Sequence, residues 1–216
     1  MNKRLKIARD VFGNGIFVGG EGTYVEINDE YRWGIYTSSS GRTYTEWKQT
    51  TNNSYGQLRL FSGDLMGNSG CNVYGYAMLL NSVQVDEIPV TPKEAHAAYK
   101  SFKSMNNEGT MNKLLQEKNI NATVKTIALQ NGGSNEVEKF ISVLQSGRGI
   151  LTRVGPGIYT SSGHWLVAAD IRPTQLGSTT GYDIFILTSS SRSKRTRMAK
   201  DGNSNRKSSV LLCILY

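Results

Sequence analysis

Two residues of this sequence, Cys71 and His164, have the types and positions from which a nucleophilic site could be built. A cysteine attacks through its thiolate, and an imidazole can take up the thiol proton and later give it to a leaving group. Cys71 follows Ser69 and Gly70 in a polar loop and precedes an apolar segment, which predicts a position at the start of a helix. The positive end of the helix dipole favours the thiolate there. The alternative is a half-buried structural thiol.

His164 opens the apolar run GHWLVAADIR directly after the polar loop PGIYTSSG, so it is expected at a loop-to-strand boundary that can border a site. The other histidine, His96, lies within the helical stretch EAHAAYK and is expected to be a surface or hydrogen-bonded helical residue. The second cysteine, Cys213, lies in VLLCILY, which is typical of a buried structural thiol. Nothing in the sequence supports a disulfide between the two cysteines, so we interpret both as free thiols. Two cysteines in such different settings do not make a zinc site, and we expect no metal and no cofactor.

Helical patterns occupy the middle of the chain. Residues 72–83 are apolar on nearly every face, which predicts a buried helix that begins just after Cys71. Thr91 to Glu94 form a capping box with a proline at the first helical position, which predicts a helix to about Met105. Two further helices are expected at about 111–118 and at 135–145, the second capped by Ser134 and ended by Gly147.

Strand patterns follow the helices, as β-branched or apolar runs separated by polar turns. They cover residues 121–128, 149–154, 163–172, 182–189 and 208–216. Helices followed by a run of strands predict an α+β fold with an antiparallel sheet on which the helices pack. The first 45 residues differ, with a short helix at 3–9 and then the strand-like segments GIFVGG, TYVEIN and RWGIYT. We therefore expect an N-terminal extension over 1–45, which packs or docks to a partner, and a main domain over 46–216.

The formal net charge of the 216-residue chain is +8, and most of it lies in one stretch. Residues 192–207 hold seven Lys or Arg against one Asp, so this stretch contributes +6 of the +8. Such a stretch can attract an anionic polymer, although a solvated hairpin explains it equally well. It contains no aromatic residue for stacking on bases, which makes nucleic-acid binding a weak hypothesis. No apolar segment is long enough to span a membrane, and the N-terminus does not resemble a signal peptide.

Several segments together resemble one family. NSGCNVYGYAMLL is similar to the nucleophile motif SSGCGPTSMAMVL of bacteriocin-processing-peptidase-like cysteine peptidases, a branch of the papain-like superfamily. VGPGIYTSSGHWLVAADI resembles the histidine motif GPGxFTSGGHFIVLxGI of that family over nearly its whole length, and YDIFILTSSSRSKR resembles the following VYVNDPNSRxR. VTPKEAHAAY and TEWKQTTN match its helix after the nucleophile and its oxyanion segment. The resemblance covers about residues 44–200.

The resemblance implies a papain-like fold with a cleft between the helices and the sheet, and acyl transfer with Cys71 as nucleophile and His164 as base. It implies that the backbone N–H of Cys71 and the Gln49 side chain hold the oxyanion, with Gln57 as the rival for that role. The Gly-Pro of the nucleophile motif is replaced by Asn72 and Val73.

The orienting aspartate of the family falls on Thr188 or Ser189. A hydroxyl fixes an imidazole tautomer but does not stabilise an imidazolium as a carboxylate does, so a lower rate is expected. Asp183 is the outside candidate for this role. Asp170 lies six residues along the strand from His164, about 20 Å away if the chain is extended.

These features predict a cysteine peptidase or amidase that hydrolyses peptide bonds, with peptidoglycan as the expected substrate in a phage-type lysin or a virion-associated hydrolase. Such a protein would be cytoplasmic on synthesis and would act at the cell wall after release. Residues 192–207 would then contact an anionic wall polymer. The alternative is a catalytically weakened or inactive peptidase fold that serves as a binding or structural protein.

Overall fold

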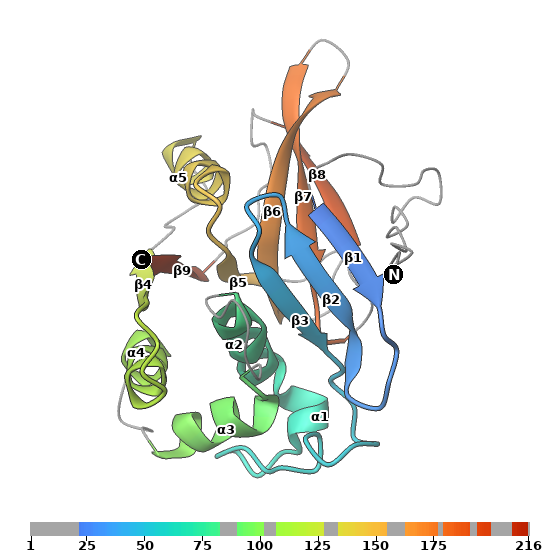
Figure 1. Cartoon of the computed structure of the whole chain (residues 1–216), viewed down its shortest axis with the longest axis vertical. Coiled ribbons are helices and arrows are strands. Elements are labelled where there is room, and N and C mark those ends of the chain that lie inside the picture. Colours follow the sequence, from blue (N-terminus) through green and yellow to red (C-terminus); the bar gives the residue numbers. More distant parts are fainter. Residues whose placement is uncertain are drawn as a thin grey trace, which may run out of the picture.

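The computed structural model describes residues 22–82, 90–101, 107–127, 134–154, 163–176, 179–190, 194–199 and 209–215. The helix expected at 3–9 and the strand expected at 15–20 lie outside these residues. Within them the chain folds as a mixture of helices and antiparallel sheets (Figure 1), as the sequence predicts at this level. No helix in these ranges is both long and apolar enough to cross a membrane.

A small sheet forms at the N-terminal side of the described chain. Its strands are β1 (Gly22–Glu26), β2 (Arg32–Ser38) and β3 (Thr43–Trp47), paired antiparallel in the order β1-β2-β3. The first two match the strand-like segments of the sequence. The third was not predicted, because its sequence TYTEW carries a charged residue in its middle. β3 crosses the expected boundary between residues 45 and 46.

Five helices occur in the described residues: α1 (Met66–Ser69), α2 (Cys71–Asn81), α3 (Pro92–Ser101), α4 (Asn107–Glu117) and α5 (Ser134–Gln145). The expected buried helix is α2, which begins at Cys71 itself. The capping box of α3 is confirmed, since the Glu94 N–H donates to Thr91 Oγ1 at 3.2 Å and the Thr91 N–H donates to Glu94 Oε2 at 2.8 Å. α4 begins earlier than expected, and α1 was not predicted. Gly147 follows α5 with a φ of 75°, a conformation that favours glycine.

The main sheet contains β4 (Thr123–Ile127), β5 (Ile150–Val154), β6 (His164–Leu176), β7 (Thr179–Leu187), β8 (Lys194–Ala199) and β9 (Ser209–Leu215). Its order is β4-β9-β5-β6-β7-β8, and all its pairs are antiparallel. The five predicted strands are present, and β8 adds a strand inside the basic stretch 192–207. β9 lies between β4 and β5, so this segment forms an inner strand of the sheet, next to the edge strand β4.

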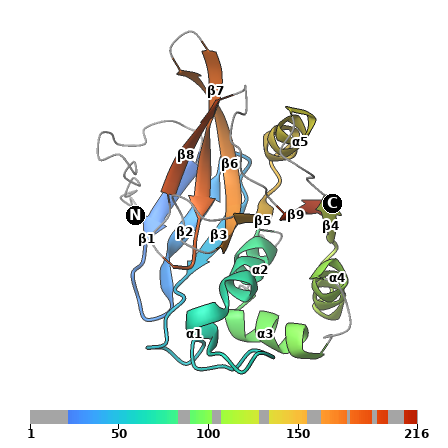
Figure 2. The same ribbon diagram turned by 180° about the vertical axis from the view of Figure 1, so that it is seen from behind.

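The two faces of the main sheet bury different partners, because successive side chains of a strand point to opposite sides. On one face Leu151, Val167 and Leu187 share a core with α2 and the small sheet. On the other face residues of the same strands pack against α5, among them Ile150 and Leu166. Figures 1 and 2 show α2 and α5 at different places along these strands.

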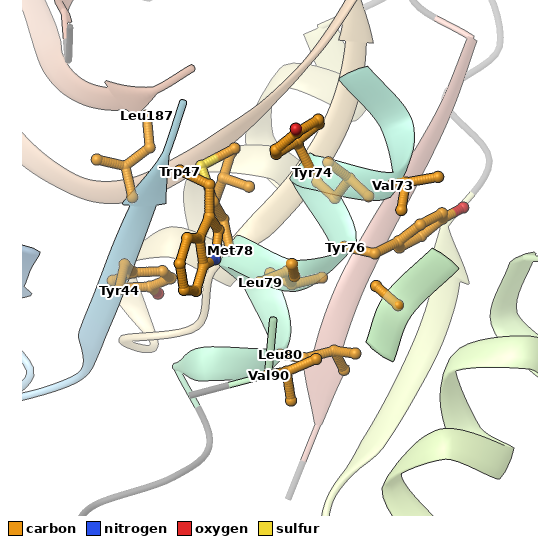
Figure 3. Packing of buried hydrophobic residues seen from close by; sticks show 14 of the residues in the cluster. Tyr44, Trp47, Val73, Tyr74, Tyr76, Met78, Leu79, Leu80, Val90 and Leu187 are labelled. Atoms are coloured by element: carbon orange, nitrogen blue, oxygen red, sulfur yellow. The ribbon is translucent and has the colours of Figure 1, made fainter. Parts of the chain in front are cut away.

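The small sheet and α2 belong to one core (Figure 3). Tyr44 and Trp47 of β3 lie beside Met78 and Leu79 of α2, and Leu187 of the main sheet lies next to them. Tyr36 of β2, the cross-strand partner of Tyr44, stacks on Phe185 of β7, with ring centroids 3.9 Å apart. The described part of the expected N-terminal extension therefore packs on the main domain.

A buried carboxylate ties the small sheet to β6. Asp170 Oδ2 accepts hydrogen bonds from Tyr36 Oη and from the Ser39 N–H, both at 2.7 Å, and Oδ1 accepts one from Ser39 Oγ at 2.7 Å. Asp170 is 9% exposed, so these donors replace water around its charge. It lies at the register shift between β6 and β7 and is not a partner of His164.

We predict that Asp170→Asn lowers the free energy of unfolding by about 1–3 kcal/mol, because one buried acceptor becomes a donor that faces other donors. Chemical denaturation measures the change. Asp64→Asn is the matched control, since Asp64 lies in an exposed turn, and it should shift stability by less than about 0.5 kcal/mol. Equal stability of the two variants would show that Asp170 does not anchor the small sheet.

Candidate active site

Cys71 is the first residue of α2, as the sequence predicts. Its neighbour Gly70 is both the last residue of the α1 turn and the N-cap of α2, and its N–H donates to the Met66 carbonyl at 2.8 Å. A Cβ at Gly70 would lie 2.3 Å from Met66 Cγ and 2.5 Å from Met66 O, so a side chain does not fit there. This glycine therefore allows α1 to turn directly into the helix that carries the thiol.

Burial is the main influence on the Cys71 thiol. It raises the pKa of Cys71, and this effect outweighs the N–H groups of Trp165, Asn72 and Cys71 itself, together with the positive charge of Arg153, all of which lower the pKa. Burial thus opposes the helix N-terminus, which the sequence analysis expects to favour the thiolate. Removing the sulfur from water disfavours its charge more than the helix N–H groups favour it. At neutral pH Cys71 is a thiol.

The Cys71 sulfur lies next to the strand that begins with His164. The backbone N–H of Trp165, the residue that follows His164, is close enough to lower the pKa of the thiol. The rings of Trp165 and Tyr76, a residue of α2, are 6.4 Å apart, which fixes the helix against this end of β6. Backbone N–H groups on two elements, α2 and β6, therefore act on the thiol in this state. Catalytic hydrogen bonds often tighten only when substrate binds.

The imidazole of His164 is buried and bound to hydroxyl groups. Its Nε2 lies 2.8 Å from Thr188 Oγ1 and 3.3 Å from Ser190 Oγ, and these two hydroxyls are 3.2 Å apart. His164 is 8% exposed and Thr188 is 2% exposed, so water does not compete for the shorter contact. Thr188 therefore occupies the place of an orienting group. Ser190 was not predicted, although it follows both candidates in the same turn.

Ser189 has a different partner from Thr188. Its Oγ donates to Gln49 Oε1 at 2.8 Å, and its carbonyl accepts the Gln49 N–H at 2.9 Å and Trp33 Nε1 at 3.3 Å. The structure thus separates two residues that the sequence ranked together. Thr188 contacts the imidazole, whereas Ser189 holds the Gln49 side chain in place.

Glu46 is a site residue that the sequence did not reveal. It is fully buried, and its Oε1 accepts the Thr188 N–H at 3.1 Å while Oε2 accepts Tyr24 Oη at 2.6 Å. A glutamate between Thr45 and Trp47 in a short polar segment gives no signal of burial. Only the pairing of β2 with β3 turns it inward, behind the turn that carries Thr188.

The remaining candidates lie elsewhere. Gln57, the rival of Gln49 for the oxyanion role, lies in an exposed loop, and its amide NH₂ group donates to the Thr51 carbonyl. Asp183, the outside candidate for orienting His164, pairs instead with Arg172 at 3.1 Å. Its place as an orienter is therefore not supported by the contacts.

His96 is buried in α3, and its Nε2 lies 2.8 Å from the Arg59 carbonyl, which makes it a hydrogen-bonded helical residue. Cys213 lies on β9 as predicted, and its side chain is outside the described part of the structure. The described ranges contain no group of three or more His, Cys, Asp and Glu side chains that could hold a metal ion.

No family model matches this sequence, and no curated protein matches it. The function must therefore be inferred from the residues of the site and their contacts.

We predict that alkylation of Cys71 by iodoacetamide follows a pH profile with its midpoint above that of an unperturbed cysteine, because burial raises the pKa of the thiol. The rate is followed on the Cys71 peptide by mass spectrometry, with Cys71→Ala as the blank. His164→Ala should leave this midpoint unchanged. A midpoint below neutral pH that is lost in His164→Ala would instead show a preformed thiolate–imidazolium pair.

Proposed function

We propose that this protein is a cysteine peptidase or amidase of papain-like type, with Cys71 as nucleophile and His164 as base. The observation that carries the proposal is the buried hydrogen bond between His164 Nε2 and Thr188 Oγ1, 2.8 Å long, at the start of the strand whose next residue contacts the Cys71 sulfur. An oriented imidazole and a thiol at a helix N-terminus, on adjacent elements, are the parts that thiol acyl transfer requires.

In the proposed reaction His164 removes the thiol proton as sulfur attacks, because a buried thiol is not ionised beforehand. With Nε2 bound to Thr188, Nδ1 is the nitrogen that takes the proton. The Cys71 sulfur adds to the amide carbonyl carbon, and the carbonyl oxygen becomes an oxyanion. When the C–N bond breaks, the proton on Nδ1 passes to the leaving amine and a thioester remains. A water deprotonated by His164 then attacks the thioester, which releases the acid and restores the thiol.

The oxyanion would be held by the Cys71 N–H and by the Gln49 amide group. The hydrogen bond from Ser189 Oγ to Gln49 Oε1 supports this role, because it occupies the oxygen end of the amide and fixes the orientation of its NH₂ end. Each such donor contributes about 3–4 kcal/mol of transition-state stabilisation in enzymes where it has been removed.

Thr188 in place of a carboxylate limits the expected rate. Its hydroxyl orients the ring, but it carries no charge to offset the imidazolium that forms during attack. A buried carboxylate that contacts this turn is that of Glu46, which accepts the backbone N–H of Thr188. A slower enzyme than a family member with an aspartate is therefore expected.

As substrate we propose the peptide bonds of peptidoglycan, in a phage-type lysin or a virion-associated hydrolase that acts at the cell wall after release. The supporting feature is the basic stretch 192–207, with a net charge of +6, which would attract an anionic wall polymer. The N-terminal extension 1–45 is proposed as a surface for a protein partner.

The second candidate is a binding protein on a peptidase fold that has lost its activity. Thr188 where the resemblance predicts an aspartate, and the raised pKa of Cys71, favour it. Under this alternative the protein would bind cell-wall peptides without cleaving them.

We predict that the full chain releases new amino groups from purified peptidoglycan and that Cys71→Ala and His164→Ala lose this activity. Removal of a general base lowers rates by about 10²–10⁴-fold, and removal of the nucleophile leaves only background. His96→Ala and Cys213→Ala are matched controls for residue type and should retain activity. Binding without turnover in the wild type would favour the inactive scaffold.

We predict that Thr188→Val lowers kcat by about threefold to tenfold, because the ring loses one neutral hydrogen bond. Thr188→Ser keeps the hydroxyl and should remain close to the wild type. Ser190→Ala removes only the longer contact and should have a smaller effect. Steady-state kinetics on one peptide substrate would compare the three variants. An active Thr188→Val combined with an impaired Ser190→Ala would assign the orienting role to Ser190.

A further inference from the structure

Arg153 is a positive charge beside the thiol that the proposed reaction does not use. It lies on β5 directly opposite Trp165 of β6, whose backbone N–H contacts the Cys71 sulfur. Side chains at opposed positions of an antiparallel pair start about 5 Å apart on the same face. Arg153 lies two residues after Leu151 on the same strand, so the two side chains point to the same face of the sheet. Leu151 packs on the α2 side, and Arg153 and Trp165 therefore both stand on the face that carries Cys71.

The guanidinium group reaches the start of β6. A Cβ at Gly163 would lie 3.5 Å from Arg153 Nη2, which places the group over the residue that precedes His164. Its charge acts on the Cys71 sulfur, whose pKa it lowers against the larger effect of burial. Arg153 is nevertheless exposed, so a dissolved ligand can reach it.

This cation has no anionic partner in the described part of the chain. Arg32 is paired with Asp29 and Arg172 with Asp183, whereas no hydrogen bond or ion pair there occupies Arg153. An arginine that a fold uses for its own stability is normally bonded to a carboxylate or a carbonyl. The Arg153 fork is therefore available for a ligand.

We infer that Arg153 binds a carboxylate of the substrate, and that the site accepts peptides with a free carboxylate next to the bond that Cys71 attacks. A guanidinium binds a carboxylate through two parallel hydrogen bonds, so it selects peptides that carry this charge and also fixes their orientation. The half-buried Trp165 ring beside it provides an apolar wall for the carbon chain that carries the carboxylate. The inference rests on the proposed function for its catalytic meaning, but the anion site itself does not require turnover.

A second role is open to the same charge, namely favouring the thiolate without contacting substrate. The two roles differ in a measurable way. An effect on the thiolate changes the rates of neutral and anionic reagents by the same factor, because both react with the thiolate. An anion-binding role raises only the rate of the anionic reagent.

The test compares alkylation of Cys71 by iodoacetate, which carries a carboxylate, and by iodoacetamide, which is neutral and of nearly the same size. Both rates are measured at one pH and low ionic strength, on the Cys71 peptide by mass spectrometry. The ratio of the two rates cancels the thiolate fraction. The variants are Arg153→Gln, Arg153→Glu and Arg153→Lys. Lys139→Gln is the control for net charge, because Lys139 is exposed on α5 at the opposite face of the sheet.

We expect Arg153→Gln to lower the iodoacetate-to-iodoacetamide ratio by about twofold to fivefold, the range of exposed ion pairs, and Arg153→Glu to lower it further. Arg153→Lys should keep most of the ratio and Lys139→Gln all of it. Added salt should reduce the wild-type ratio towards that of Arg153→Gln.

An unchanged ratio in both Arg153→Gln and Arg153→Glu, or an equal fall in Lys139→Gln, would overturn the inference. These outcomes are independent of peptidoglycan hydrolysis. If the protein shows the ratio change but does not hydrolyse peptidoglycan, the anion site stands and only the proposed enzymatic function is wrong.

Discussion

The buried hydrogen bond from the Thr188 N–H to Glu46 Oε1 is the contact on which the arrangement of the site depends. It joins the small N-terminal sheet to the turn after β7, and that turn carries the hydroxyl that holds His164. A buried carboxyl group is stable in the interior only when it is hydrogen-bonded, so Glu46 requires Thr188 and Tyr24 to be where they are. The small sheet is therefore a structural part of the site. Asp170 fixes the same sheet farther along β6.

The chemistry that follows is that of a buried, neutral thiol beside an oriented imidazole. Burial raises the pKa of Cys71, so the proposed reaction couples deprotonation to attack instead of starting from an ion pair. Thr188 contacts the ring through an uncharged hydroxyl. Arg153 adds a positive charge that acts on the sulfur. A substrate carboxylate would neutralise it when the peptide binds.

Much of the fold could be predicted from local patterns. The capping box at Thr91, the apolar run after Cys71 and the alternating runs of the main sheet determine their elements through interactions within a few residues. β3 and β8 were missed because Glu46 interrupts the first and three of the six residues of the second are basic, so neither has an apolar pattern. The position of β9 between β4 and β5 depends on pairing over long sequence distances, which no local pattern records.

The site residues that could be predicted are those whose chemical type and place in a helix or strand are both visible in the sequence. Cys71 at a helix start and His164 at a strand start are visible in the sequence, and the resemblance directed attention to Thr188, Ser189 and Gln49. The separate partners of Thr188 and Ser189 could not be predicted, because which hydroxyl reaches the ring depends on how the turn is held by Glu46 and Gln49. The raised pKa of Cys71 could not be predicted either, since burial is a property of the whole fold.

The most direct test of the central claim is to trap the acyl-enzyme. Protein incubated with soluble peptidoglycan peptides is quenched in acid, which preserves a thioester, and is digested for mass spectrometry. The account predicts an acyl adduct on the Cys71 peptide that is labile to hydroxylamine and absent in Cys71→Ala, and that accumulates when deacylation is slowed in Thr188→Val. Release of product by the wild type with no adduct on Cys71, or an unchanged rate in Cys71→Ala, would contradict it.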